Sequence, residues 1–166
     1  MDFYQFPTSL GLMALASEGD FITHLYLPSY PTPRLASHPT PLLLEGERQL
    51  LEYLGGQRKT FDLPLNPQGT PFQKRVWQAL EAIPWGELRS YRDIALAVDC
   101  PRGFRAVGMA NHNNPIPIFI PCHRVIGADG SLTGYGGGLQ IKRTLLDLER
   151  RTLEKQRETE LRKAAQ

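Results

Sequence analysis

The sequence predicts a small α/β domain in its front half and a mostly α domain with a helix-turn-helix in its back half. Three short apolar and aromatic runs, followed by one helical pattern, indicate a small antiparallel sheet plus a helix. Two short helical patterns joined by a glycine-containing turn indicate the helix-turn-helix. We therefore assign residues 1–65 to the α/β domain, 66–69 to a linker, 70–150 to the helix-turn-helix domain and 151–166 to a charged tail.

Hydrophobic runs and chain breakers define the elements expected in the front half. The predicted strands are Phe3–Phe6, Leu12–Ser17 and Phe21–Leu27, with Phe61–Leu65 as a further short strand. A proline-rich loop over residues 28–41 leads into a helix over 42–54, where apolar residues recur near a 3.6-residue period. The pair Gly55-Gly56 ends this helix.

Capping residues define the helices of the back half. Thr70 is an N-cap, Pro71 occupies the first helical position and Gln73 completes a capping box. Ser90 caps a second helix, with Asp93 three residues on, and a third helix is expected over residues 104–111. A last helix follows a glycine-rich loop at 134–138, and the charged residues after 150 either extend it or fray.

Composition and charge limit the kinds of partner. With 41% hydrophobic and 22% charged residues, and no apolar run of membrane-spanning length, the chain has the composition of a soluble globular protein. It has two cysteines and no secretion signal, which favours a reducing cytoplasmic setting over a disulfide. Residues 1–68 carry four basic and seven acidic side chains, whereas 69–166 carry 15 and ten. The basic half indicates either a phosphate-bearing partner or a solvated tail.

The segment Ile118–Ile126 contains the best candidate for a reactive group. An apolar run leads into Pro121-Cys122-His123-Arg124, which holds the thiol rigidly in a partly dry place. Cys122 is therefore either a buried structural cysteine or a nucleophile activated by a base. Adjacent side chains point apart, so His123 would act through a bridging water, with Glu149 as the carboxylate that orients the imidazole.

The sequence around Cys122 resembles that of the O6-alkylguanine-DNA alkyltransferases. The acceptor motif of that family matches Pro121-Cys122-His123-Arg124-Val125. The resemblance continues without obvious gaps from Thr70 to Glu149, and the front half agrees more loosely. The other matching motifs are Thr70-Pro71-Phe72-Gln73 with Val76-Trp77, Ile83-Pro84-x-Gly86, Ser90-Tyr91, Arg105-Ala106-Val107-Gly108, Asn114-Pro115-Ile116-Pro117, Thr133-Gly134-Tyr135-x-Gly137-Gly138, Lys142 and Leu145-Leu146-x-x-Glu149.

The resemblance implies a role for each catalytic position. Cys122 matches the alkyl acceptor, His123 the base that deprotonates it through water, and Glu149 the carboxylate that orients the histidine. Asn114 matches the asparagine that braces the active-site turn. Tyr91 matches the tyrosine that protonates the base as the alkyl group leaves. The implied fold is a ribonuclease H-like front domain and a winged-helix-like back domain.

The resemblance also implies contacts with a flipped nucleotide. Arg105 matches the arginine that fills the gap left in the duplex, and Tyr135 with Gly136 matches the loop that closes over the base. Backbone groups of Val125 and Ile126 would meet the guanine edge. The other residues expected to contact substrate or DNA are Ser90, Ala106, Gly108 and Arg124, with Gly103 and Ala110 as further small residues on the same helix. Phosphate contacts are expected from Lys74, Arg92, Arg102 or Lys142.

The activity implied is direct-reversal DNA repair, in which the alkyl group of O6-alkylguanine, and of O4-alkylthymine, passes irreversibly to Cys122 in a single turnover. No cofactor and no metal are expected, because the damaged base already carries an activated carbon. The expected partner is double-stranded DNA containing the lesion, and not a membrane. The protein is expected to be a monomer, with cooperative binding on DNA left open.

Some positions depart from the family pattern. Thr144 and Leu148 stand where relatives often carry tryptophan and histidine, and Arg102-Gly103-Phe104 replaces commoner small residues. Gly136 stands where some relatives carry a serine that bonds O6. These departures leave the accepted alkyl size and the fit of the third helix to DNA open.

Three alternative functions differ from the alkyltransferase in testable ways. A binding-only relative would carry another residue, typically tryptophan, where this chain has Cys122. A cysteine hydrolase would need an oxyanion hole and turnover on an ester or amide. A helix-turn-helix regulator would bind one particular sequence tightly, with Cys122 merely buried.

Overall fold

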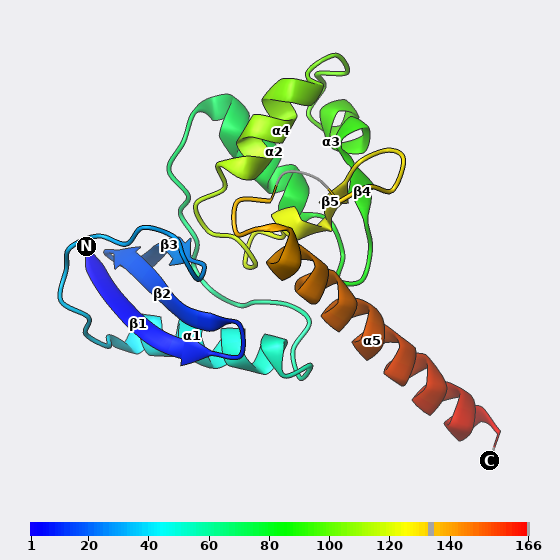
Figure 1. The fold of residues 1–166 in the computed structure, drawn as a ribbon, viewed down its shortest axis with the longest axis horizontal. Helices are drawn as coiled ribbons and strands as arrows, with labels where there is room; N and C mark the ends of the chain where they lie inside the picture. Colours follow the sequence, from blue (N-terminus) through cyan, green and yellow to red (C-terminus); the bar gives the residue numbers. More distant parts are fainter. Residues whose placement is uncertain (133–134, 166) are drawn as a thin grey trace.

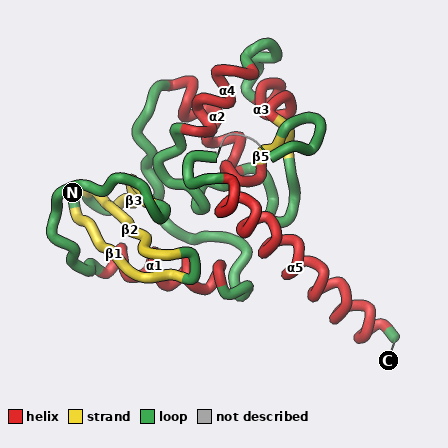
Figure 2. Tube along the Cα trace, in the orientation of Figure 1, coloured by secondary structure: helices red, strands yellow, loops and turns green. Residues whose placement is uncertain are grey.

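The front half is a three-stranded antiparallel sheet with one helix. The structure is a computed structural model, which describes residues 1–132 and 135–165. Strands β1 (Asp2–Thr8), β2 (Gly11–Glu18) and β3 (Phe21–Tyr26) pair in sequence order, so β2 is central. Figure 2 shows α1 (Pro41–Leu54) against this sheet. The three predicted strands and the predicted helix are therefore present.

Helix α1 lies close to the central strand because it carries a glycine at the contact. Thr40 caps the helix through the Leu43 amide, and Pro41 follows at its first turn. Leu43 and Leu50 are fully buried on its inner face. A Cβ added to Gly46 would lie only 2.7 Å from the Leu15 side chain of β2. The missing side chain therefore permits close approach of helix and sheet.

The prediction of a further strand at Phe61–Leu65 is wrong. Only Leu65 pairs, in an isolated parallel bridge with Ile22. The Ile22 amide donates to the Pro64 carbonyl, and the Ile22 carbonyl accepts from the Asn66 amide across this bridge. Pro64 has no N–H to donate, and Pro67 ends the run on the other side, so the pairing cannot be extended.

The back half contains the predicted helix-turn-helix. Helices α2 (Pro71–Glu81), α3 (Tyr91–Ala97) and α4 (Phe104–His112) follow one another, and both predicted capping boxes are present. The Trp77 indole N–H of α2 donates to the Ala110 carbonyl of α4 at 2.8 Å, in a buried contact. This bond links the first and third of these helices and presents the other side of α4 to solvent.

Two short parallel strands place the predicted acceptor beside α3. Strand β4 (Arg89–Ser90) pairs with β5 (Val125–Ile126), in the register Arg89 to Val125 and Ser90 to Ile126. The 3₁₀ turn η1 (Cys122–Arg124) leads directly into β5. The start of α3 and the candidate nucleophile are thus joined by backbone pairing.

The last helix, α5 (Leu139–Ala164), extends through the predicted charged tail. Of the two outcomes left open for residues after 150, the helical one is present. Leu145 and Glu149 of its first half are buried, whereas the second half projects away from the body of the protein (Figure 1). The predicted loop residues Thr133 and Gly134 lie outside the described residues.

One hydrophobic core runs through both halves. It includes Leu15 and Leu43 in the front half and Leu80, Val107 and Leu145 in the back half. The boundary predicted at residues 66–69 therefore separates two sequence regions that share a core. In the described part of the chain, no helix is long and apolar enough to cross a membrane.

The capping box of α2 provides a test of this local structure. Thr70 accepts from the Gln73 amide at 3.1 Å. We expect Thr70→Ala to lower the free energy of unfolding by about 1 kcal/mol, measured by urea denaturation. Thr159→Ala, at an exposed site within α5, serves as control and should change it by less than about 0.5 kcal/mol. Equal effects of the two changes would contradict the assigned cap.

Candidate active site

The segment that leads to Cys122 is held in a strained turn. Ile118 has a φ of 73°, which a β-branched residue rarely adopts, and is buried. Asn114 fastens this turn at both ends, since its side chain donates to the Ile120 carbonyl at 2.8 Å and accepts from the Ile116 amide at 3.0 Å. Such backbone conformations cost about 1–3 kcal/mol and persist only when their surroundings hold them.

The 3₁₀ turn η1 directs three consecutive functional side chains into the protein. Cys122, His123 and Arg124 are all buried, with His123 completely covered. The Asn111 side chain donates to the Cys122 carbonyl at 3.4 Å. The turn thereby fixes the thiol, the imidazole and the guanidinium relative to one another.

The Glu149 carboxylate accepts hydrogen bonds from four groups. Its Oε2 accepts from His123 Nε2 at 2.7 Å and from the Tyr53 hydroxyl at 2.5 Å. Its Oε1 accepts from the Gly86 amide at 3.1 Å and from Arg124 Nε at 2.9 Å. The two oxygens of this buried carboxylate are thus well satisfied, as a buried charge requires.

These contacts set the protonation states of Glu149 and His123. Burial alone would raise the pKa of Glu149, but the hydrogen bonds and charges of His123 and Arg124 hold that pKa well below its ordinary value. Burial lowers the pKa of His123 despite the opposing effect of Glu149. The carboxylate is therefore charged and the imidazole neutral at pH 7. Because both pKa values are depressed on folding, the stability they contribute is present at neutral pH and is lost on acidification.

The neutral imidazole has one nitrogen available for chemistry. An ionised carboxylate accepts, so His123 Nε2 carries the proton, and Nδ1 is left as an acceptor. Nδ1 is buried and has no hydrogen-bond partner within residues 1–132 and 135–165. A base of this kind can take a proton from a nearby thiol or from a water between them.

The Cys122 thiol is covered in this state. Burial raises its pKa to about 11, against lowering contributions from Asn114, Lys142 and Tyr135. The sulfur is thus protonated at neutral pH and needs a base before it can act as a nucleophile.

Across the described ranges, no group of three His, Cys, Asp or Glu side chains is arranged to hold a metal ion.

The segment Tyr135–Gly138 packs against a loop of the front half. Tyr135 is buried, and burial followed by the Cys122 charge raises its pKa well above 10. The same two causes raise the pKa of Tyr30 to about 12. A Cβ on Gly136 would lie 2.5 Å from the Tyr30 hydroxyl. The phenol of Tyr30 therefore occupies the space that a side chain at position 136 would need.

Helix α4 presents a small-residue surface to solvent. Arg105 and Ala106 are exposed, and a Cβ on Gly108 would meet no atom within 4 Å. Two of the small residues expected on this surface lie elsewhere. Ala110 is buried against Trp77, and Gly103 lies in the turn, where a Cβ would be 2.5 Å from the Cys100 sulfur.

Two basic residues expected at the DNA are instead internal. Arg124 is 6% exposed and donates to Glu149 and to the Ile83 carbonyl. Lys142 is fully buried, and its ammonium group donates to the Val125 carbonyl at 2.6 Å. Neither side chain can reach a phosphate without breaking these contacts. The other candidates for phosphate contact, Lys74, Arg92 and Arg102, are exposed.

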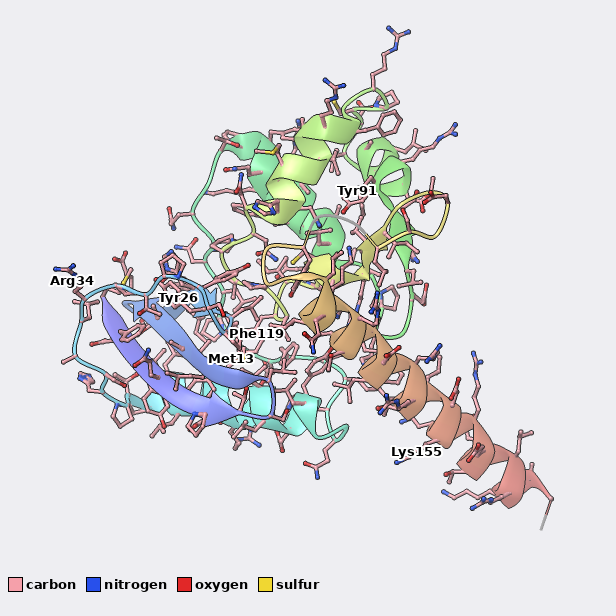
Figure 3. The ribbon with its side chains drawn as sticks, in the orientation of Figure 1. Met13, Tyr26, Arg34, Tyr91, Phe119 and Lys155 are labelled. Carbon is pink, nitrogen blue, oxygen red and sulfur yellow. The ribbon has the colours of Figure 1, made fainter. Side chains whose placement is uncertain are left out.

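Ser90 and Tyr91 lie near the acceptor through the pairing of β4 with β5. Both are half-buried, and Tyr91 is the first residue of α3 (Figure 3). Ser90 is opposite Ile126, and its hydroxyl caps α3 by accepting from the Asp93 amide. Val125 is fully buried, so its carbonyl serves Lys142 within the protein.

Sequence reasoning missed two tyrosines and an asparagine at this site. Tyr53 bonds Glu149 across 96 positions of sequence, and Tyr30 lies in the proline-rich loop predicted at residues 28–41. Asn111 is the last residue of the predicted third helix. The phase of α1 places Tyr53 on its buried face with Leu50, which is the only signal that could have indicated an internal hydroxyl.

A buried thiol beside a histidine–carboxylate pair, in a domain with an exposed helix of a helix-turn-helix, defines a nucleic-acid-binding protein that carries its own nucleophile. Residues 71–151 match the model of the family described as "6-O-methylguanine DNA methyltransferase, DNA binding domain". The constitutive methylated-DNA–protein-cysteine methyltransferase of Bacillus subtilis is 53% identical over 151 residues, which cover 86% of this chain and 92% of that protein. The crystal structure of Mycobacterium tuberculosis OGT in complex with DNA is similar, with a TM-score of 0.86 and 42% identity over 92% of this chain and 94% of that one. The chain belongs to this family of methylated-DNA–protein-cysteine methyltransferases.

The internal role of Arg124 can be tested by its effect on stability. Arg124→Met keeps much of the side-chain volume but leaves the buried Glu149 without its fixed positive partner. We expect the free energy of unfolding, measured by urea denaturation, to fall by about 3–5 kcal/mol. Arg150→Met breaks an exposed pair with Asp147 on the same helix and should cost less than about 1 kcal/mol. A small effect of Arg124→Met would show that the buried pair is not a structural requirement.

Proposed function

We propose that this protein repairs DNA by transferring the alkyl group of O6-alkylguanine to Cys122, in a reaction that consumes the protein. The observation that carries this proposal is the arrangement of η1, where the buried thiol is followed by an imidazole whose Nε2 is bound to Glu149 and whose Nδ1 has no hydrogen-bond partner among the described residues. The family relationship supplies the class of substrate.

The first step is removal of the thiol proton. His123 Nδ1 accepts it through a bridging water, and Glu149 stabilises the imidazolium that forms. Because burial raises the pKa of Cys122 to about 11, proton transfer and attack have to be closely coupled. Asn114 keeps the turn rigid while the sulfur changes its charge.

The second step is attack of the sulfur on the alkyl carbon. The S–C bond forms as the C–O6 bond breaks, and the electron pair of that bond passes to the guanine. Tyr91 supplies a proton to the departing base from the start of α3, next to the β4–β5 pair. The products are guanine and an S-alkylcysteine, which is a stable thioether.

The damaged nucleotide must leave the helix to reach the sulfur, which costs a few kcal/mol. The exposed surface of α4 can approach a groove closely at Ala106 and Gly108, and Arg105 can enter the space left in the stack. Lys74, Arg92 and Arg102 would contact phosphates without reading sequence. Since the free thiol is covered, Tyr135 and Gly136 would move outward to admit the base and then close over it.

The same chemistry extends to O4-alkylthymine, whose alkyl carbon is activated in the same way. Val125 and Ile126 lie directly after η1, and the half-buried Ile126 is the one proposed to meet the edge of either base, because the Val125 N–H and carbonyl are bonded to Cys122 and Lys142. We place the reaction in the cytoplasm, because a thiol nucleophile needs a reducing compartment. The reacting unit is a monomer, since every proposed catalytic group comes from one chain.

Cys122→Ser tests the identity of the acceptor. The wild-type protein, incubated with a duplex oligonucleotide containing O6-methylguanine, should gain a methyl group on the peptide that contains Cys122, detected by peptide mass spectrometry. The serine variant should show no transfer but should bind the same duplex with similar affinity, because α4 is unchanged. Cys100→Ser serves as the control and should retain full transfer. Methylation of any other residue in the Cys122→Ser protein would identify a different acceptor.

Arg105→Ala tests the role of α4 in nucleotide flipping. We expect transfer from duplex DNA to slow by about 10-fold or more, as loss of about 1.4 kcal/mol or more of stabilisation implies. Reaction with a free O6-alkylguanine base should be nearly unchanged, because no stack has to be opened. Lys155→Ala changes an exposed charge on the projecting half of α5 (Figure 3) and should affect neither substrate. Equal losses on duplex and free base would exclude the insertion role.

A further inference from the structure

A row of aromatic rings connects the front half of the protein to the acceptor turn. Tyr53, near the end of α1, packs against Phe61 with ring centroids 5.3 Å apart. Phe61 packs against Phe119 at 4.6 Å, and Phe119 lies three residues before Cys122. Tyr53 is 1% exposed, so its ring is part of the core and its position is well defined.

The hydroxyl of Tyr53 reaches the oxygen that binds the histidine. It lies 2.5 Å from Glu149 Oε2 and 3.4 Å from His123 Nε2, while Nε2 itself lies 2.7 Å from the same oxygen. The three atoms therefore form a closed triangle. One corner of it comes from α1, one from η1 and one from α5.

Charge decides the direction of these hydrogen bonds. Glu149 is ionised, so both the phenol and the imidazole donate to it. Burial, followed by the Glu149 charge, raises the pKa of Tyr53 well above 10, which keeps the phenol protonated. The titratable or charged groups around the imidazole are Tyr53 from α1, Cys122 and Arg124 from η1, and Lys142 and Glu149 from α5.

We propose that Tyr53 is a positioning residue for alkyl transfer, which fixes the Glu149 carboxylate from the front half of the protein and through it orients His123. The shared oxygen divides its electron density between two donors, so the phenol weakens the pull of the carboxylate on the histidine proton. The phenol also prevents rotation of the carboxylate away from the imidazole. The front half thereby contributes the Tyr53 hydroxyl to the orientation of the histidine.

This inference rests on the proposed function, and Tyr53→Phe tests it in the full-length protein. The change removes one oxygen and keeps the ring in the aromatic row. Transfer from O6-methylguanine DNA to Cys122 should slow by about 10-fold at neutral pH, because the base is less well oriented; this equals about 1.4 kcal/mol on the barrier. Because Glu149 would bind the histidine proton more strongly, the acidic limb of the pH–rate profile should move to higher pH.

Tyr4→Phe is a matched control. The Tyr4 hydroxyl also donates to a carboxylate in the front half, Glu47, at 3.1 Å, but away from the site. The transfer rate and the pH–rate profile of Tyr4→Phe should equal those of the wild type. If Tyr53→Phe leaves the rate and the acidic limb unchanged, Tyr53 is a core residue with no positioning role.

A second measurement separates this inference from the proposed function. Imidazole ¹⁵N titration by NMR should show a higher pKa of His123 in Tyr53→Phe than in the wild type. If the wild-type protein transfers no methyl group, the proposed function fails, and this titration still decides whether Tyr53 controls His123. An unchanged His123 titration would overturn the inference even where repair is active.

A variant that preserves every contact covers the case in which Tyr53→Phe does not fold. Replacing Tyr53 with 3-fluorotyrosine keeps the ring and the hydroxyl and makes the phenol a stronger donor. The acidic limb and the His123 titration should then move to lower pH, opposite to the phenylalanine change. A shift in the same direction for both changes would contradict the proposed hydrogen bond.

Discussion

The Glu149 carboxylate is the constraint on which the site depends. A buried charge is tolerated only when it is compensated and both oxygens are hydrogen-bonded. Its donors are Tyr53 of α1, Gly86 after α2, and His123 with Arg124 of η1. These segments are distant in sequence, so the carboxylate is satisfied only after both halves of the chain have assembled around α5. The histidine is consequently oriented by the complete fold and not by its own turn.

The burial of the Cys122 thiol also affects its reactivity. A protonated sulfur reacts slowly with oxidants and adventitious electrophiles, and burial raises the pKa of Cys122 to about 11. His123 is neutral and its Nδ1 is available, so the means of activation is present while the sulfur remains unreactive. In the proposed repair reaction the nucleophile reacts only once, so this protection would preserve it until the damaged base enters, because every unproductive alkylation would destroy a protein molecule.

Much of the fold could be predicted from the sequence, because its signals are local. Both capping boxes, at Thr70 and Ser90, and the three strands depend on residues within a few positions of each other. The strand predicted at Phe61–Leu65 is absent because Pro64 within it and Pro67 just after it lack the N–H donors that a ladder needs. At the site, the pairing of His123 with Glu149 was expected from the chemistry that an imidazole requires, and the two groups are in contact. Tyr53 carries no comparable requirement, so only the packing of α1 could have revealed it.

The basic residues show that a positive charge in the back half need not mark a DNA contact. Arg124 and Lys142 add to the positive charge of the back half, but they are buried, where one neutralises Glu149 and the other holds the Val125 carbonyl. The outer half of α5 carries charges of both signs, and this part of the helix extends away from α4 (Figure 1). What remains for phosphates is a small exposed set on and between α2, α3 and α4, led by Lys74, Arg92 and Arg102. The phosphate contacts proposed for these residues would give salt-sensitive binding without sequence preference, which suits a search of all DNA for a rare lesion.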